Sequence, residues 1–151
     1  MKTDKKSIES FFETRHIAIA GVSRNPKKFG NVVYQELKTN GYTVYQVNPN
    51  VSELNGEVCY KSVSELPPEA ASLLIATSKG QTLQVLKDAV TKGIRNIWIQ
   101  QMSETKEAIE FARSSNITPI MKECIFMFAE PVKGFHKFHR NIKKFFGALP
   151  K

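Results

Sequence analysis

Short apolar runs along the chain are separated by segments in which apolar residues recur every three or four positions. The runs end in glycine, proline or polar residues and are too short for helices, which is typical of buried parallel strands. Four such runs span residues 16–21, 43–47, 71–76 and 96–100, and a fifth begins at 118–121 and ends near Cys124.

The intervening segments predict helices. Apolar residues have helical spacing in Ser7–Thr14, Asn31–Asn40 and Gln81–Lys92, and a further helix is expected to start at Ser103. Residues 50–68 are instead predicted to form a long connection that contains an Asn-Gly turn. Strands that alternate with helices predict a parallel sheet covered on both faces. With right-handed crossovers the expected fold is a single doubly wound, Rossmann-like α/β domain with a five-stranded parallel sheet over residues 1–130.

The composition agrees with a globular domain and excludes several classes of protein. The chain has 151 residues, of which 41% are hydrophobic and 24% charged. No apolar run approaches the roughly 20 residues that a bilayer requires. The N-terminus has no apolar signal core, and two cysteines are too few for a disulfide framework, so a cytoplasmic location is expected.

The charge belongs mostly to one end of the chain. Six basic residues and no acid lie between Val132 and Lys151, which leaves +2 of the total +8 for the remainder. Apolar residues in 135–146 have near-helical spacing, so residues 131–151 are expected to form a basic, aromatic-rich extension with an amphipathic helix. Three interpretations stay open: packing on the domain or on a second copy in a homodimer, contact with an anionic membrane, and contact with nucleic acid.

In an open α/β sheet, ligands bind beyond the carboxyl ends of the strands, where the strand order reverses. This rule nominates the segments that directly follow the expected strands. They are Gly21-Val22-Ser23-Arg24, Asn48-Pro49-Asn50, Thr77-Ser78-Lys79, Gln100-Gln101 and Glu123-Cys124.

The first of these segments suits a phosphate. A glycine at the turn lets the backbone approach a phosphate closely, and the helix that follows offers free N–H groups. Arg24 and Lys28 add positive charge, although an ordinary loop with solvated lysines would look similar. Ser23 and Pro26 stand where the dinucleotide fingerprint needs glycine, and no acid ends the second strand to hold a ribose, which counts against NAD.

Four motifs, in order along the chain, resemble the CoA-binding domain family, which is similar to the nucleotide-binding domain at the N-terminus of the succinyl-CoA synthetase alpha subunit. They are residues 17–26, Val47-Asn48-Pro49, Gly56-Glu57-Val58-Cys59-Tyr60 and Ile97-Trp98-Ile99-Gln100. The resemblance covers residues 15–125 and implies a ligand with an adenosine diphosphate head and a pantetheine arm, which is coenzyme A or an acyl-CoA.

The resemblance also implies roles for the nominated segments. Gly21–Arg24 would wrap the phosphates, Asn48-Pro49-Asn50 would lie against the nucleotide, and Thr77 with Gln100-Gln101 would line the groove. The family often has a basic residue after Asn-Pro and Phe-Arg after the third strand. This chain has Asn50 and Thr77-Ser78-Lys79 there, and Lys28 or Lys79 would replace the missing charge.

Binding without catalysis is the expected function. A CoA ligase of the larger family needs a second domain with a phosphorylated histidine and a partner subunit, for which 151 residues leave no room. His16 lies at the wrong end of its strand, and His136 and His139 lack the carboxylate or cysteine neighbours of a metal site. The alternatives are an NAD(P)- or nucleotide-dependent enzyme on the same fold, and nucleic-acid association through the basic extension.

Two hypotheses remain open for the role of the Cys124 thiol. At the carboxyl end of the fifth expected strand, its thiol would meet the CoA thiol and form a mixed disulfide under oxidation. Alternatively it is a small buried hydrophobe, which is the common role of a free cysteine.

Overall fold

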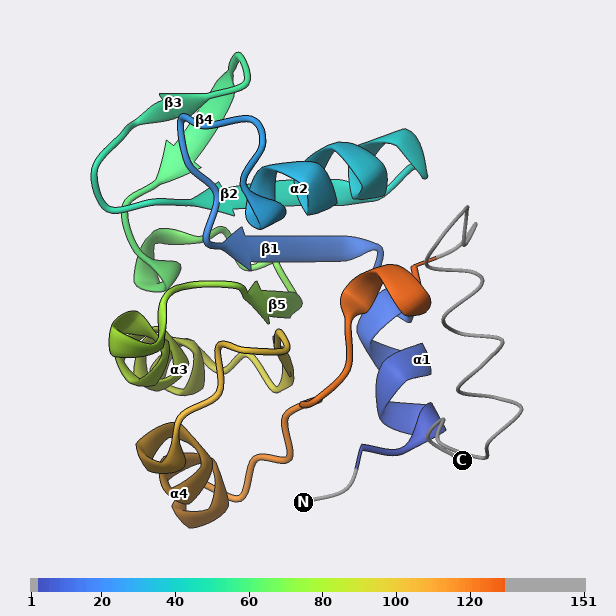
Figure 1. Cartoon of the computed structure of the whole chain (residues 1–151), viewed down its shortest axis with the longest axis vertical. Helices are drawn as coiled ribbons and strands as arrows, with labels where there is room; N and C mark the ends of the chain where they lie inside the picture. Colours follow the sequence, from blue (N-terminus) through green and yellow to red (C-terminus); the bar gives the residue numbers. More distant parts are fainter. Residues whose placement is uncertain (1–2, 130–151) are drawn as a thin grey trace.

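A six-stranded sheet forms the middle layer of the computed structural model, which describes residues 3–129 (Figure 1). Its strand order is β3-β4-β2-β1-β5-β6, and every neighbouring pair is parallel except the β3–β4 pair. The strands are β1 (His16–Ala20), β2 (Thr43–Val47), β3 (Glu53–Leu54), β4 (Glu57–Tyr60), β5 (Ser72–Ile75) and β6 (Asn96–Ile99).

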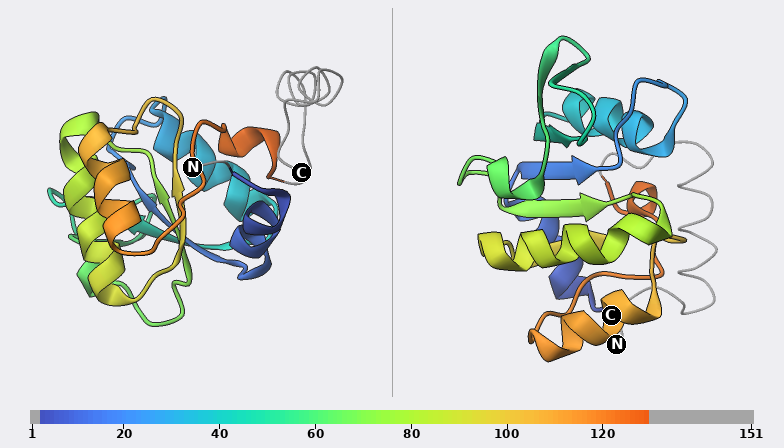
Figure 2. Two further views of the ribbon diagram at one scale, coloured as in Figure 1. Left: turned by 90° about the horizontal axis from the view of Figure 1, so that it is seen from below. Right: turned by 90° about the vertical axis from the view of Figure 1, so that its left-hand side faces the viewer.

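Helices cover both faces of this sheet. Figure 2 shows α3 and α4 together on one face, and α1 and α2 on the other. The helices are α1 (Lys5–Glu13), α2 (Phe29–Thr39), α3 (Lys79–Lys92) and α4 (Lys106–Ser114), with single 3-10 turns η1 (Val63–Glu65) and η2 (Ile125–Met127). The expected Rossmann-like α/β class is therefore confirmed.

The alternation of side chains along β1 explains why both faces are covered. Ile17 and Ile19 belong to the core on the α1 and α2 side, whereas Ala18 and Ala20 belong to the core on the α3 and α4 side. All four side chains are buried. A strand that buries both faces reads as a continuous apolar run, which is how the sequence revealed it.

The sheet has six strands because four of the five expected strands form and a hairpin in the connection after β2 adds two more. Asn55 and Gly56 both have positive φ, 55° and 71°, as a two-residue hairpin turn requires. The turn joins β3 to β4, and β4 then adds to the sheet beside β2. The alternation of polar and apolar residues over these two short strands was too brief to predict them.

The expected fifth strand at 118–121 is reduced to one bridge. Ile120 N–H donates to Ile97 O at 2.9 Å, and Ile99 N–H donates to Ile120 O at 2.8 Å. Pro119 has no N–H to donate, and Lys122 turns the chain with φ 61°. The helix expected at Ser103 begins at Lys106 instead, with Thr105 as its N-cap.

The predicted extension at 131–151 and its helix lie outside the described residues. Over residues 3–129, the helices are too short and too polar to cross a bilayer.

Candidate functional site

The strand order reverses at β1. The chain leaves β1 toward β2 on one side and later returns to β5 on the other, so the loops after β1 and β5 diverge in opposite directions. In doubly wound sheets the crevice between such loops, beyond the carboxyl ends of the strands, is where ligands bind.

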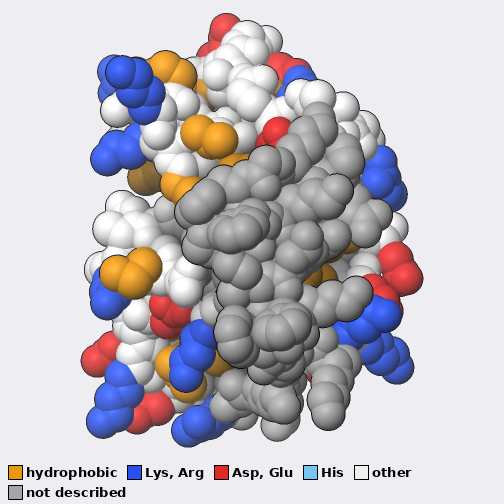
Figure 3. Space-filling model, turned by 45° about the vertical axis from the view of Figure 1, so that its right-hand side comes forward, with side chains coloured by type: hydrophobic (Ala, Val, Ile, Leu, Met, Phe, Trp, Pro, Cys, Tyr) orange, Lys and Arg blue, Asp and Glu red, His pale blue; other side chains and the backbone are white. Residues whose placement is uncertain are grey.

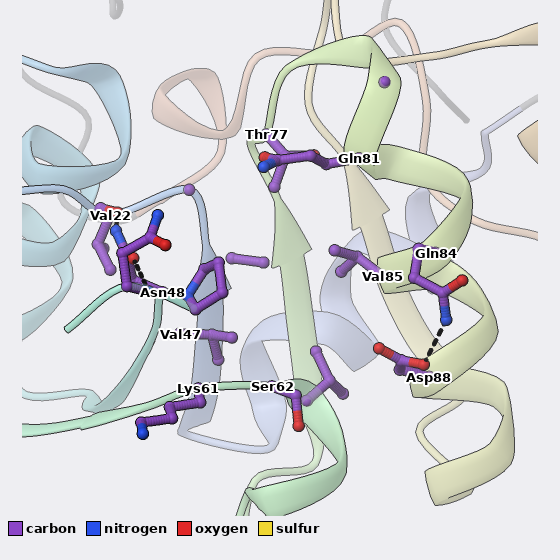
Figure 4. A pocket seen from close by; sticks show the side chains of 16 residues that line it. Val22, Val47, Asn48, Lys61, Ser62, Thr77, Gln81, Gln84, Val85 and Asp88 are labelled. Carbon is purple, nitrogen blue, oxygen red and sulfur yellow. Dashed lines mark hydrogen bonds between the residues drawn. The ribbon is translucent and has the colours of Figure 1, made fainter. Parts of the chain in front are cut away.

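A cavity of about 350 Å³ lies at this point (Figure 4). Its walls come from the ends of β1, β2 and β5, the loop after β4, and one face of α3. The lining residues are Ala20, Gly21, Val22, Val47, Asn48, Pro49, Asn50, Lys61, Ser62, Val63, Thr77, Gly80, Gln81, Gln84, Val85 and Asp88.

Two glycines bring the turn after β1 close to its neighbours. Gly21 has φ 123°, and a Cβ atom there would lie 2.3 Å from Ala76 O. A Cβ atom on Gly30, in the first turn of α2, would lie 2.3 Å from Gly21 O. No side chain fits at either position without a backbone shift, so α2 starts directly against the end of β1.

Two asparagine side chains fix the shape of this turn. Buried Asn31 accepts the Ser23 N–H at 2.8 Å and donates to Ser23 O at 2.7 Å. Asn48 Nδ2 donates to Val22 O at 2.8 Å. The carbonyl groups of Val22 and Ser23 are therefore engaged by protein donors, which lowers their repulsion of an anion at the turn.

The helices beside the cavity begin without side-chain caps. Asp4 caps α1 and Thr105 caps α4 through side-chain hydrogen bonds, whereas Lys28 before α2 and Ser78 before α3 form none. The first turns of α2 and α3 also contain no acid. No side-chain cap or first-turn acid offsets the partial positive charge of these two N-termini, which favours an anion, and of the two helices α3 lines the cavity.

One face of α3 forms the wall opposite the β1 turn. Gln81, Gln84, Val85 and Asp88 follow the spacing i, i+3, i+4, i+7 and all line the cavity. Gln84 Nε2 donates to Asp88 Oδ1 at 2.9 Å. These residues were not predicted from the sequence, although polar residues at this spacing on a helix are a signal that could have identified them.

The loop after β4 closes the end of the cavity. Lys61, Ser62 and Val63 line it there, and Glu65 accepts the Lys61 N–H at 3.2 Å. This loop was also missed, because its position depends on β4 joining the sheet, which the sequence did not reveal.

Six of the residues predicted for the site meet at the cavity. They are Gly21, Val22, Asn48, Pro49, Asn50 and Thr77. Ser23, Arg24 and Lys28 lie on the loop that leaves the cavity, and Arg24 and Lys28 are exposed. Lys79 is exposed in the first turn of α3, one residue before the lining residue Gly80.

The remaining predicted residues lie near β6, away from the lining. Gln100 is buried, and its Oε1 accepts the Ile125 N–H at 3.2 Å, so its amide holds the η2 segment. Gln101 is exposed. Cys124 is half-buried and directly precedes η2. None of the three lines the cavity.

His16 lies at the opposite end of β1. Its Nδ1 is 2.8 Å from the Tyr45 hydroxyl, and burial raises the pKa of that phenol. The position agrees with the structural role expected from the sequence. Within residues 3–129, histidine, cysteine and acidic side chains form no cluster of three that would hold a metal.

The charged side chains of residues 3–129 do not gather in one patch on the face drawn in Figure 3. Figure 3 shows Lys and Arg side chains in separate groups around the margin of one face, several of them beside acidic side chains. The ion pairs found between residues 3 and 129 are Lys5–Glu9 and Lys38–Glu57.

Comparison with known proteins gives the family. The model of the CoA binding domain family matches residues 15–130. The alpha subunit of ADP-forming acetate–CoA ligase II from Pyrococcus furiosus is 33% identical over 129 residues, which are 78% of this chain and 28% of the subunit. This chain therefore spans little more than a quarter of that relative's length.

Two relatives are of more similar length. The uncharacterized protein YneT of Bacillus subtilis is 24% identical over 112 residues, 74% of this chain and 83% of YneT. The solved structure of a conserved hypothetical protein from Pyrococcus furiosus is 36% identical, with a TM-score of 0.70, over 74% of this chain and 96% of that one. From the family match, which covers most of its length, the chain belongs to the CoA-binding domain family.

Proposed function

We propose that the cavity binds coenzyme A or an acyl-CoA and that the chain catalyses no reaction by itself. The observation that carries this proposal is the position of the cavity: it lies at the reversal of strand order, between the glycine turn after β1 and the uncapped N-terminus of α3.

The diphosphate of CoA suits the end of the cavity at Gly21, Val22 and Gly80. The turn brings backbone close there, and the first turn of α3 offers N–H groups and a favourable dipole. Arg24 and Lys28 are exposed on the adjoining loop, where they add long-range attraction for a polyanion. The apolar side chains of Val47, Val63 and Val85 suit the uncharged parts of the ligand.

We assign binding, and not ligation, to the described residues 3–129. The position of His16 supports the assignment, since it lies at the amino end of β1 with Tyr45 as its partner. A histidine there does not reach a ligand at the carboxyl ends of the strands.

Calorimetric titration of the purified, reduced protein with CoA and acetyl-CoA tests the proposal, with NAD and ATP as comparison ligands. We expect saturable binding of CoA that weakens as salt is raised, because phosphate contacts are screened. The double variant Arg24→Ala, Lys28→Ala weakens CoA binding. The matched double variant Lys106→Ala, Arg113→Ala removes the same charges from exposed positions on α4 and leaves it unchanged. Clear binding of NAD without binding of CoA would overturn the proposal.

A further inference from the structure

The two ends of the cavity differ in chemistry. At one end are Gly80 and Gln81, in the uncapped first turn of α3. At the other end are Ser62, in the loop after β4, and Asp88, which lies eight residues after Gly80 and so about 12 Å further along α3 at 1.5 Å per residue. An anion is favoured at the first end and repelled by the Asp88 carboxylate at the second.

The Asp88 carboxylate is held in a defined orientation. Its Oδ1 accepts the Gln84 amide at 2.9 Å, and Figure 4 shows the other carboxylate oxygen on the side toward Val85 and the cavity. Neither of the ion pairs within residues 3–129 involves Asp88, and the cation that lines the cavity with it is Lys61. An ionised carboxylate only accepts hydrogen bonds, and this end of the cavity therefore selects a donor.

The space beside Asp88 has apolar walls. Val63 of η1 and Val85 of α3 line it, together with Val47 at the end of β2. Lys61, Ser62 and Gln84 also line the cavity, and apolar walls with a few directed polar groups are the usual setting in which a flat ring is bound and oriented.

We propose that Asp88, oriented by Gln84, is a specificity residue that selects a base with an exocyclic amino group at its edge, as adenine has, over a base with a carbonyl oxygen there. This inference rests on the proposed function, because it assumes that the phosphates of the ligand occupy the α3 N-terminus. An amino group donates to the carboxylate, whereas a carbonyl oxygen meets it acceptor to acceptor and leaves both groups without a partner.

Displacement of bound CoA by ADP and by IDP tests the inference, since IDP has a carbonyl oxygen in place of the amino group and a proton on the adjacent ring nitrogen N1. We expect ADP to compete about tenfold better than IDP on the wild-type protein. Losing a hydrogen bond to a charged group weakens affinity by at least about this factor. In Asp88→Asn the preference disappears and IDP competes better than before, because an amide can donate as well as accept.

Two further variants serve as controls for the effect of Asp88→Asn. Gln84→Ala removes the group that orients Asp88 and should reduce the preference for ADP without removing it. Glu110→Gln makes the same charge change as Asp88→Asn at an exposed position on α4 and should retain the full preference. Equal competition by ADP and IDP on a protein that binds CoA overturns this inference alone. Failure to bind CoA at all overturns the proposed function and this inference with it.

Discussion

The carboxyl edge of the sheet has two regions that sequence reasoning treated alike and the structure separates. In the cavity region, at the ends of β1, β2 and β5, loops and α3 surround an open space. In the β6 region, residues 100–104 and 122–125, polar groups bind one another. Trp98 Nε1 donates to Glu123 O at 3.1 Å, and Gln100 accepts the Ile125 N–H.

Glu104 illustrates the β6 region further. Its two carboxylate oxygens accept the N–H groups of Met102 at 2.9 Å and Lys122 at 3.1 Å. Both of these residues have positive φ, so one side chain stabilises two unfavourable backbone conformations. Being at the ligand-binding edge of an α/β sheet is therefore not enough to make a polar residue a ligand. What matters is whether the surrounding loops leave an open space beside it, as they do at the ends of β1, β2 and β5.

The largest effect should come from filling the close approach at the turn after β1. Gly21→Ala places a Cβ atom against Ala76 O at positive φ, and we expect roughly 3 kcal/mol or more of destabilisation. Gly80→Ala is the matched control. A Cβ atom there meets nothing within 4 Å, so this variant should be more stable than the wild type by about 0.5–1 kcal/mol of folding free energy. Urea denaturation of both variants measures the difference, and equal stabilities would contradict the packing described for the turn.

A smaller effect is expected in the β6 region. Gln100→Leu leaves the Ile125 N–H without its acceptor and should cost about 1–3 kcal/mol of folding free energy. CoA affinity should stay at the wild-type value in native buffer, since Gln100 does not line the cavity. A large loss of affinity at unchanged stability would return Gln100 to the ligand site, where the sequence analysis had placed it.

The smallest effect concerns the contact of α2 with the first residue of β4. Hydrogen bonds from Lys38 and then Tyr34 lower the pKa of Glu57. A lowered pKa in the folded state gives stability that is complete above the ordinary carboxyl pKa of 4.5 and is lost as the pH falls through the folded value.

Glu57→Gln should therefore remove part of the acid dependence of stability below about pH 4.5 and change stability at pH 7 by roughly 0.5 kcal/mol, because both partners are partly exposed. Thermal unfolding of the variant and the wild type between pH 3 and pH 7 measures this. Identical pH profiles would show that the pair contributes nothing to folding.

Much of the fold could be predicted because its signals are local. The predicted strand at 43–47 has the bounds of β2, and Gly93 ends α3 at positive φ. The β3–β4 hairpin escaped because two-residue and four-residue strands carry almost no periodicity, and Glu57 and Val58 are both exposed.

The site was only half predictable for a related reason. Residues directly after a strand, such as Gly21 and Asn48, are placed by the strand itself. Asp88 reaches the cavity only because α3 packs over β5 and presents one particular face, which depends on tertiary contacts. Asn31 was missed as well: a polar residue on the inward face of α2 is the signal, and its bonds to Ser23 are the reason.

The most direct test of the central claim places a negative charge at the α3 N-terminus. Gly80→Glu has room for its Cβ atom, and an acid in the first turn favours the helix, so folding should be retained or improved. CoA affinity, measured by calorimetry, should fall roughly tenfold or more through repulsion of the diphosphate. Gln35→Glu adds the same charge at an exposed position on α2 that does not line the cavity, and it should bind CoA like the wild type. Unchanged affinity in folded Gly80→Glu would contradict the account, because CoA would then bind away from this helix terminus.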